Sequence, residues 1–172
     1  MTLLPLFPLN SVLFPGVPLS LHIFEPRYQK MIDYCLEHDV AFGVVLIRKG
    51  KEALAPLAEP YEVGCTARIT HTKQLTLGRK NLLTIGEERF KILSTDRSEE
   101  YLQARVEFLP RFTAHLPLLE PLSKRLHKYI AKYIKLLVKA EMIQAQIYSL
   151  PEDPIELAYL SAHLLQISPR YK

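Results

Sequence analysis

The residues that could do catalytic chemistry are few, and their spacing does not suit it. A phosphate-binding loop needs four residues between its first glycine and Gly-Lys-Ser/Thr, because backbone amides must cup the phosphate. Here six residues separate Gly43 from Gly50-Lys51-Glu52, and the last position is acidic. Ser123 and Lys124 are neighbours on a predicted helix, where they would point about 100° apart, so they do not form a nucleophile–base pair. We therefore predict no catalytic residues.

Histidine and cysteine give no metal or redox signal. The six histidines show no ligand spacing, and GxSxG, HExxH and GxGxxG are all absent. Cys35 and Cys65 lie thirty residues apart and fit neither a metal nor a redox motif, so we expect two buried free thiols. The sequence thus predicts no cofactor, no metal and no enzyme; an enzyme of unrecognised chemistry is the remote alternative.

Basic residues are concentrated in one segment, which could bind nucleic acid. Residues 119–142 hold six basic and two acidic residues, whereas residues 1–118 hold fourteen and thirteen. Helical spacing puts five lysines and the adjacent Arg125 on one face; the lysines are Lys124, Lys128, Lys132, Lys135 and Lys139. Such a stripe can neutralise phosphates, but it is also typical of the solvated face of an amphipathic helix. Tyr129 and Tyr133 are assigned to the apolar face, with Leu122, so no aromatic platform is expected.

Glu25 and Arg27 could form an acid–cation site, but their setting predicts a structural strand-to-helix corner held by an ion pair or by caps. Pro26 suits the first turn of a helix, where a missing N–H has no partner. Apolar residues then recur at helical spacing from Arg27 to His38. Glu25 would lie at the positive end of that helix.

The remaining elements of residues 1–110 are predicted to be strands. Leu3 to Leu9 contains prolines and is expected at the edge or start of a sheet. Val17 to Ile23 alternates, and Ala41 to Ile47 is a continuous apolar run typical of a central strand. Three further strands are expected at Glu62–Thr72, Asn81–Leu93 and Tyr101–Leu109, the first two joined by a turn at Gly78-Arg79, with a bulge or bend at Gly86.

The pattern changes after Pro110. Helical spacing runs from Leu119 to about Met142, and a second helix begins at Pro154. We therefore predict a β-rich body, residues 1–110, and a C-terminal helical subdomain, residues 111–172. Prolines interrupt the apolar N-terminus, which predicts neither a signal peptide nor a membrane span, and the expected location is the cytoplasm.

Several motifs, taken in order, resemble the N-terminal substrate-binding domain of Lon proteases. They are Leu4-Pro5-Leu6-Phe7-Pro8-Leu9, Val12-Leu13-Phe14-Pro15-Gly16, Leu21-His22-Ile23-Phe24-Glu25-Pro26-Arg27-Tyr28, Phe42-Gly43-Val44-Val45-Leu46, Val63-Gly64-Cys65-Thr66-Ala67-Arg68-Ile69 and Ile85-Gly86-Glu87-Glu88-Arg89-Phe90-Lys91-Ile92. The resemblance covers nearly the whole chain. Leu77 departs from it, because the family often has an acidic residue at that turn.

The resemblance implies an α+β fold: a β-rich, PUA-like pseudo-barrel with one inserted helix, followed by a small C-terminal helical piece. It implies structural roles for the family-motif residues Glu25, Pro26, Arg27, Tyr28, Gly64, Gly86, Arg89 and Phe90. The sequence holds no ATPase or Ser-Lys peptidase module, so recognition carries over and proteolysis does not.

The leading hypothesis is a non-catalytic module that recognises polypeptide, in protein quality control or as an adaptor. Candidate contacts are large apolar residues in predicted turns and loops, namely Leu13, Phe14, Leu54, Leu57, Leu75 and Leu77. Leu13 and Phe14 are either turned inward or offered to a partner. Expected partners are polypeptide substrates or proteins, with no membrane, and the chain is expected to be a monomer or weak homodimer. The alternative is an RNA- or DNA-binding protein that uses the lysine stripe of residues 124–139.

Overall fold

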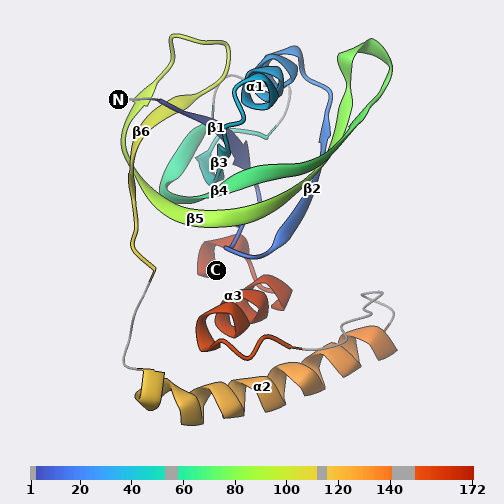
Figure 1. Ribbon diagram of the computed structural model, residues 1–172, viewed down its shortest axis with the longest axis vertical. Coiled ribbons are helices and arrows are strands. Elements are labelled where there is room, and N and C mark those ends of the chain that lie inside the picture. Colours follow the sequence, from blue (N-terminus) through green and yellow to red (C-terminus); the bar gives the residue numbers. More distant parts are fainter. Residues whose placement is uncertain (1–2, 53–57, 112–115, 141–149) are drawn as a thin grey trace. The chain divides into compact units, whose positions relative to one another are not determined.

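The structure is a computed structural model that describes residues 3–52, 58–111, 116–140 and 150–172 (Figure 1). Packing divides the chain into two units, Met1–Pro110 with Gln166–Lys172, and Arg111–Leu165. Residues 166–172 thus group with the first unit, whereas the sequence analysis placed them with the helical piece. The first unit contains β1 (Leu4–Leu9), β2 (Pro18–Ile23), α1 (Pro26–Glu37), β3 (Phe42–Lys49), β4 (Glu59–Gln74), η1 (Thr76–Gly78), β5 (Lys80–Asp96), β6 (Gln103–Phe108) and η2 (Pro169–Tyr171).

The strands form one six-stranded sheet that curls back on itself. Its order is β2-β5-β4-β3-β1-β6, and β6 also pairs with β5. One side of β5 therefore carries two partners in succession, β2 along residues 80–85 and β6 along residues 90–96. β4 and β5 form the long curved hairpin in green in Figure 1. The expected mixed α+β architecture is confirmed, and β3 is the buried central strand that its apolar run predicted.

Of the two alternatives for the proline-containing first strand, an edge or a start, the edge is wrong. β1 lies between β3, with which it is parallel, and β6, with which it is antiparallel. Its prolines are tolerated because each falls outside one of the two ladders. Pro5 precedes the ladder with β3, which begins at Leu6, and Pro8 follows the ladder with β6, which ends at Pro5.

The core of this unit packs around Phe90, which is fully buried with Leu6, Val45, Leu102 and Ala104. Two glycines make room for its ring. A Cβ on Gly43 would lie 2.6 Å from Phe90 Cζ, and one on Gly64 would lie 2.5 Å from the same atom. Real side chains essentially never approach so closely, so these positions exclude larger residues.

α1 begins at Pro26, as predicted, with the proline in the first turn of the helix. Tyr28, Met31, Ile32 and Cys35 form its buried face. The Lys80 ammonium on β5 is almost fully buried and lies 2.9 Å from Asp33 Oδ1, so an ion pair ties this helix to the tip of the β4–β5 hairpin.

The second unit consists of α2 (Leu116–Lys139) and α3 (Pro154–Leu164), which pack together. Ile130, Ile134 and Leu137 form the buried face of α2, and Leu157 is buried on α3. Asp153 caps α3, because one carboxylate oxygen accepts from the backbone N–H groups of Ile155 and Glu156. The second predicted helix thus begins at Pro154 as expected.

Candidate functional site

The outer edge of β2 has backbone groups that pair with no other strand in the described part of the chain. β2 is the terminal strand of the sheet and pairs only with β5 among the described residues. Val17, just before β2, accepts a hydrogen bond from the Gly86 N–H at 3.0 Å, so its main chain faces β5. Because backbone groups alternate along an antiparallel strand, Leu19, Leu21 and Ile23 also face β5. The main chains of Pro18, Ser20 and His22 therefore point away from the sheet.

A groove of about 260 Å³ lies along this edge. We call it the edge groove; it is lined by Phe7 and Leu9 of β1, by the end of β2, by Glu25 and Tyr28 at the start of α1, and by Glu52. Phe7 and Tyr28 pack with ring centroids 4.3 Å apart, so the groove has an aromatic wall. Burial raises the pKa of Tyr28 to about 12, so this wall stays uncharged well above physiological pH.

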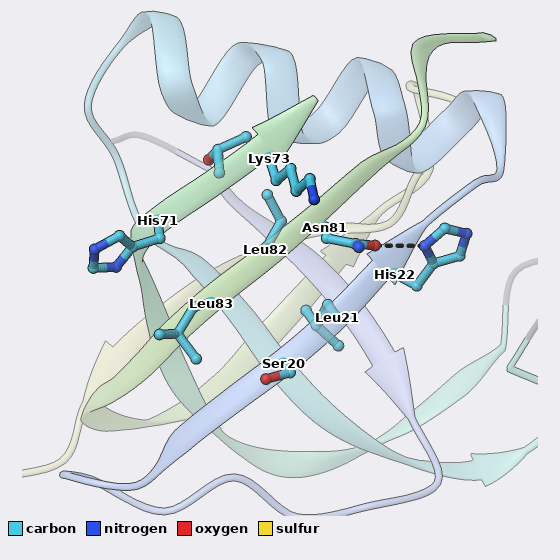
Figure 2. Close-up of a pocket in the computed structure, with 9 residues that line it drawn as sticks. Ser20, Leu21, His22, His71, Lys73, Asn81, Leu82 and Leu83 are labelled. Carbon is cyan, nitrogen blue, oxygen red and sulfur yellow. Dashed lines mark hydrogen bonds between the residues drawn. The ribbon is translucent and has the colours of Figure 1, made fainter. Parts of the chain in front are cut away.

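A second depression, the outer hollow, lies on the other side of β2. Its volume is about 630 Å³, and it is lined by residues 20–22 of β2, 71–73 of β4 and 81–83 of β5. Figure 2 shows these side chains on three adjoining strands, with the His22–Asn81 hydrogen bond of 2.6 Å near the edge. Leu83 is 40% exposed here, and Phe24, which lines the edge groove and stacks with His22, is 42% exposed. The hollow therefore combines apolar surface with Lys73, His71 and His22.

The predicted contact residues do not gather into one site. Leu13 and Phe14 are only 7% and 9% exposed, which favours the inward alternative, and neither lines the edge groove or the outer hollow. Their turn is held by Gly86, whose N–H donates to Val17 and whose carbonyl accepts from the Gly16 N–H. Leu54 and Leu57 lie outside the described residues.

Leu75 and Leu77 lie at the tip of the β4–β5 hairpin. Leu75 is half-buried, and Leu77 is 83% exposed in η1. The backbone of Leu77 is left-handed, with φ 59° and ψ 35°. A large branched side chain is rare in that conformation, because its Cβ crowds the following carbonyl. The exposed Leu77 side chain is thus carried on a strained backbone.

The family-motif residues hold the framework around the edge groove. Glu25 and Arg27 form the predicted ion pair, with Arg27 Nη2 2.9 Å from Glu25 Oε2. The Glu25 carboxylate makes no capping bond to the helix, so its role is to anchor Arg27, whose guanidinium lies 4.6 Å from the centre of the Tyr28 ring. Arg89 donates to the Pro110 carbonyl at 3.3 Å, at the end of this unit.

The basic stripe on α2 is exposed, as expected, but the assignment of the neighbouring aromatic and apolar residues needs correction. Lys124 pairs with Glu120 at 2.7 Å, and the described residues give the other stripe residues no ion pair. Tyr129 is 63% exposed, and Leu122 is exposed as well, so neither belongs to the buried face. Helical spacing puts Tyr129 beside Arg125 and Lys132. The buried face of α2 is therefore narrower than predicted, and among the described residues of this unit α3 is the element that packs on it.

The described residues contain no group of three or more His, Cys, Asp or Glu side chains that could hold a metal ion. Cys35 and Cys65 are buried free thiols, as predicted, and burial raises the pKa of each to about 12. No helix within the described ranges is long and apolar enough to cross a bilayer.

Sequence reasoning missed the edge of β2 and the exposed Phe24 and Leu83. One signal was present: Pro18 inside an alternating strand is typical of an edge. The two prolines of Leu3–Leu9 drew the edge assignment to β1 instead. The edge of β2 is exposed because no further described strand pairs with it beyond β5. No local sequence pattern contains this information about strand order.

Comparisons with known proteins agree with the fold and extend over the chain. Residues 3–172 match the family described as "ATP-dependent protease La (LON) substrate-binding domain". Among curated proteins, Lon protease 2 of Syntrophobacter fumaroxidans is 26% identical over 159 residues, which cover 92% of this chain and 20% of that protein. The chain spans between 12% and 20% of the length of the first curated relatives.

Two solved structures are similar. The Lon N-terminal domain protein from Xanthomonas campestris is 30% identical with a TM-score of 0.62, covering 76% of this chain and 75% of the other. The N-terminal domain of Mycobacterium avium complex Lon protease has a TM-score of 0.72 at 15% identity, covering 99% and 87% of the two chains. The second likeness concerns the fold alone.

Proposed function

Because this chain belongs to the Lon substrate-binding domain family, we propose that it is a non-catalytic module that recognises polypeptide. The family supports a substrate-recognition role, and the match over residues 3–172 is the observation that carries the proposal. Extended or unfolded segments are the proposed ligands. They expose both backbone groups and apolar side chains, whereas native proteins bury most of both.

The geometry of the first unit supports this ligand class. The unpaired edge of β2 can exchange backbone hydrogen bonds with an extended segment. The edge groove and the outer hollow flank that edge and expose apolar side chains such as Leu83 and Phe24. Exposed apolar surface of this kind marks an interaction site when polar residues surround it.

The wider role proposed is protein quality control, or service as an adaptor that presents polypeptides to another protein. The two buried thiols suit a reducing compartment, and we place the protein in the cytoplasm. A monomer or weak homodimer is sufficient for this role, because the β2 edge and both depressions belong to one unit of one chain.

The test compares unfolded with native polypeptide. Fluorescein-labelled α-lactalbumin, reduced and carboxymethylated, is titrated with the 172-residue chain, and anisotropy is measured at low and moderate salt. We expect saturable, salt-tolerant binding of the unfolded protein, no binding of native α-lactalbumin, and no cleavage after prolonged incubation. Lack of binding would refute the polypeptide assignment, and cleavage that persists through purification would refute the non-catalytic one.

Nucleic-acid binding through α2 is the second candidate, and the exposure of Tyr129 is the observation that favours it. An aromatic ring beside Arg125 and Lys132 offers a base-stacking surface next to phosphate-neutralising charge. The probe is a labelled 20-mer single-stranded RNA. Changing Lys128, Lys132 and Lys135 to Glu should abolish RNA binding and flatten its salt dependence, while polypeptide binding is retained. RNA binding that persists in this triple variant would exclude the lysine stripe as its site.

A further inference from the structure

We propose that the polypeptide ligand binds as an added strand on the outer edge of β2, with alternate apolar side chains seated in the edge groove. This rests on the proposed function and specifies how the ligand is bound. β2 carries the sequence PLSLHI, with no charged residue, and it is the terminal strand of the sheet order. Natural edge strands are usually protected by charge, proline or a bulge, and the only such device in β2 is Pro18 at its start.

The hydrogen bonds available to a ligand are those of Ser20 and His22. One observation sets this alternation: the Gly86 N–H donates to the Val17 carbonyl. It puts Pro18, which has no N–H, at an outward position, where no bond to β5 is lost. Thr84 Oγ1 also donates to the Leu19 carbonyl at 3.0 Å, which places Leu19 on the β5 side. Ser20 and His22 together offer two N–H donors and two carbonyl acceptors, enough to align about four residues of an extended segment.

The groove determines which side chains the segment should carry. Side chains of an added strand alternate between the two faces of the sheet. On one face they would enter the edge groove beside Phe7, Leu9 and Tyr28, where apolar residues fit. On the other face they would lie beside Ser20 and His22 at the margin of the outer hollow, where polar residues fit. The ligand class is therefore an extended segment in which apolar and polar residues alternate.

The strand facing β2 across the groove does not compete for the same ligand bonds. β1 contributes Phe7 and Leu9 to the groove wall. On the side of β1 that faces β6, the ladder ends at Pro5, and the next hydrogen bond runs from the Leu6 N–H to the Leu102 carbonyl. The following outward position is Pro8, which has no N–H to donate. β1 thus supplies apolar contact, and β2 supplies the hydrogen-bond donors.

The experiment uses the full chain and a fluorescein-labelled peptide in which leucine alternates with serine, with lysines at both ends for solubility. Ser20→Pro removes the outward N–H without removing a bond to β5, and it repeats the arrangement already present at Pro18. Ser20→Ala is the matched control, because it loses the hydroxyl and keeps the N–H. We expect Ser20→Pro to weaken peptide binding at least tenfold and Ser20→Ala to leave it unchanged.

A second measurement keeps the wild-type chain and modifies the peptide. One peptide is N-methylated at every serine and another at every leucine. An added strand forms backbone hydrogen bonds through only one of these two sets of residues, so one peptide should lose binding at least tenfold while the other keeps it. Methylation at serine should weaken binding if the added strand is antiparallel to β2, and methylation at leucine should weaken it if the strand is parallel. This measurement decides the question even where Ser20→Pro fails to fold.

The outcomes separate the two proposals. Equal effects of both methylations, no effect of either, or failure of the alternating peptide to bind a chain that binds carboxymethylated α-lactalbumin would each overturn strand addition on β2. The polypeptide-recognition proposal would survive in those cases. Failure to bind any unfolded polypeptide would overturn both.

Discussion

Leu77 should contribute to polypeptide binding and at the same time destabilise the fold. Its side chain is 83% exposed, so it gains almost nothing from burial, while its backbone occupies the left-handed region. That conformation costs a bulky residue about 1–2 kcal/mol, and asparagine tolerates it far better. Leu77→Asn should therefore raise the free energy of unfolding by about 1 kcal/mol. Leu77→Gly should gain less, roughly 0.5 kcal/mol, because glycine loses more conformational entropy on folding.

Leu77→Ala separates the side chain from the backbone. Alanine keeps the left-handed cost and removes the exposed apolar group, so stability should stay within about 0.5 kcal/mol of wild type. Binding of carboxymethylated α-lactalbumin should fall equally in the Ala and Asn variants, since both remove the same apolar contact.

Thermal unfolding and anisotropy titration of the four proteins provide the assay. A gain of 1 kcal/mol corresponds to a rise in Tm of roughly 2–4 °C for a chain of this size. The strain argument is refuted when Leu77→Asn melts at or below the wild-type temperature. The binding argument is refuted when all three variants bind the unfolded protein as tightly as the wild type does.

Three further predictions concern the framework. Gly64→Ala should lower the free energy of unfolding by about 1–3 kcal/mol, because its Cβ would lie 2.5 Å from Phe90 Cζ and 2.6 Å from the Val44 carbonyl; an unchanged urea midpoint would contradict this. Asp153→Ala should cost about 0.5–1 kcal/mol, the low end for a cap partly open to solvent, while Asp153→Asn should retain most of the cap. The hydrogen bond from the Glu156 N–H is the main cause that lowers the pKa of Asp153 below its usual 3.8. The stabilisation by the cap is therefore complete above pH 3.8 and is lost as the pH falls through the lowered pKa. A Glu156 amide chemical shift that does not follow the Asp153 titration would contradict this pH dependence. Cys35 and Cys65, whose pKa values are about 12, should resist a thiol reagent at pH 8 until urea unfolds the chain, and rapid labelling of the native protein would show that they are accessible.

Much of the fold could be predicted from the sequence because its signals are local. Pro26 set the start of α1, the apolar run from Ala41 identified the central strand β3, and Pro154 set the start of α3. The family motifs added the order of the elements. Gly64 and Gly86 stand in those motifs, and the structure gives the physical reason: one accommodates the Phe90 ring, and the other would drive a Cβ into the Phe14 carbonyl.

The candidate site could not be predicted in the same way, because it depends on which strands lack neighbours. Pro5 and Pro8 looked like edge residues, yet the ladder with β3 begins after Pro5 and the ladder with β6 ends before Pro8. Leu13 and Phe14 looked like loop contacts, yet Gly86 turns their loop inward. Tyr129 was assigned to a buried face that extends less far around α2 than its apolar residues suggested. The errors on β1 and Tyr129, and the choice left open for Leu13 and Phe14, all depend on partners distant in the sequence. Periodicity within one segment carries no information about such partners.

The position of β1 between β3 and β6 has a consequence during synthesis. β1 is synthesised long before its partner β6: Leu4 pairs with Ala104, which lies far along the chain. Until then the nascent chain carries an apolar strand whose second neighbour does not yet exist, and such strands seed aggregation. Pro5 and Pro8 disfavour pairing of that strand with other polypeptide chains, because each proline lacks the backbone N–H donor. We therefore expect the two prolines of β1 to limit aggregation of the nascent chain until β6 has been synthesised.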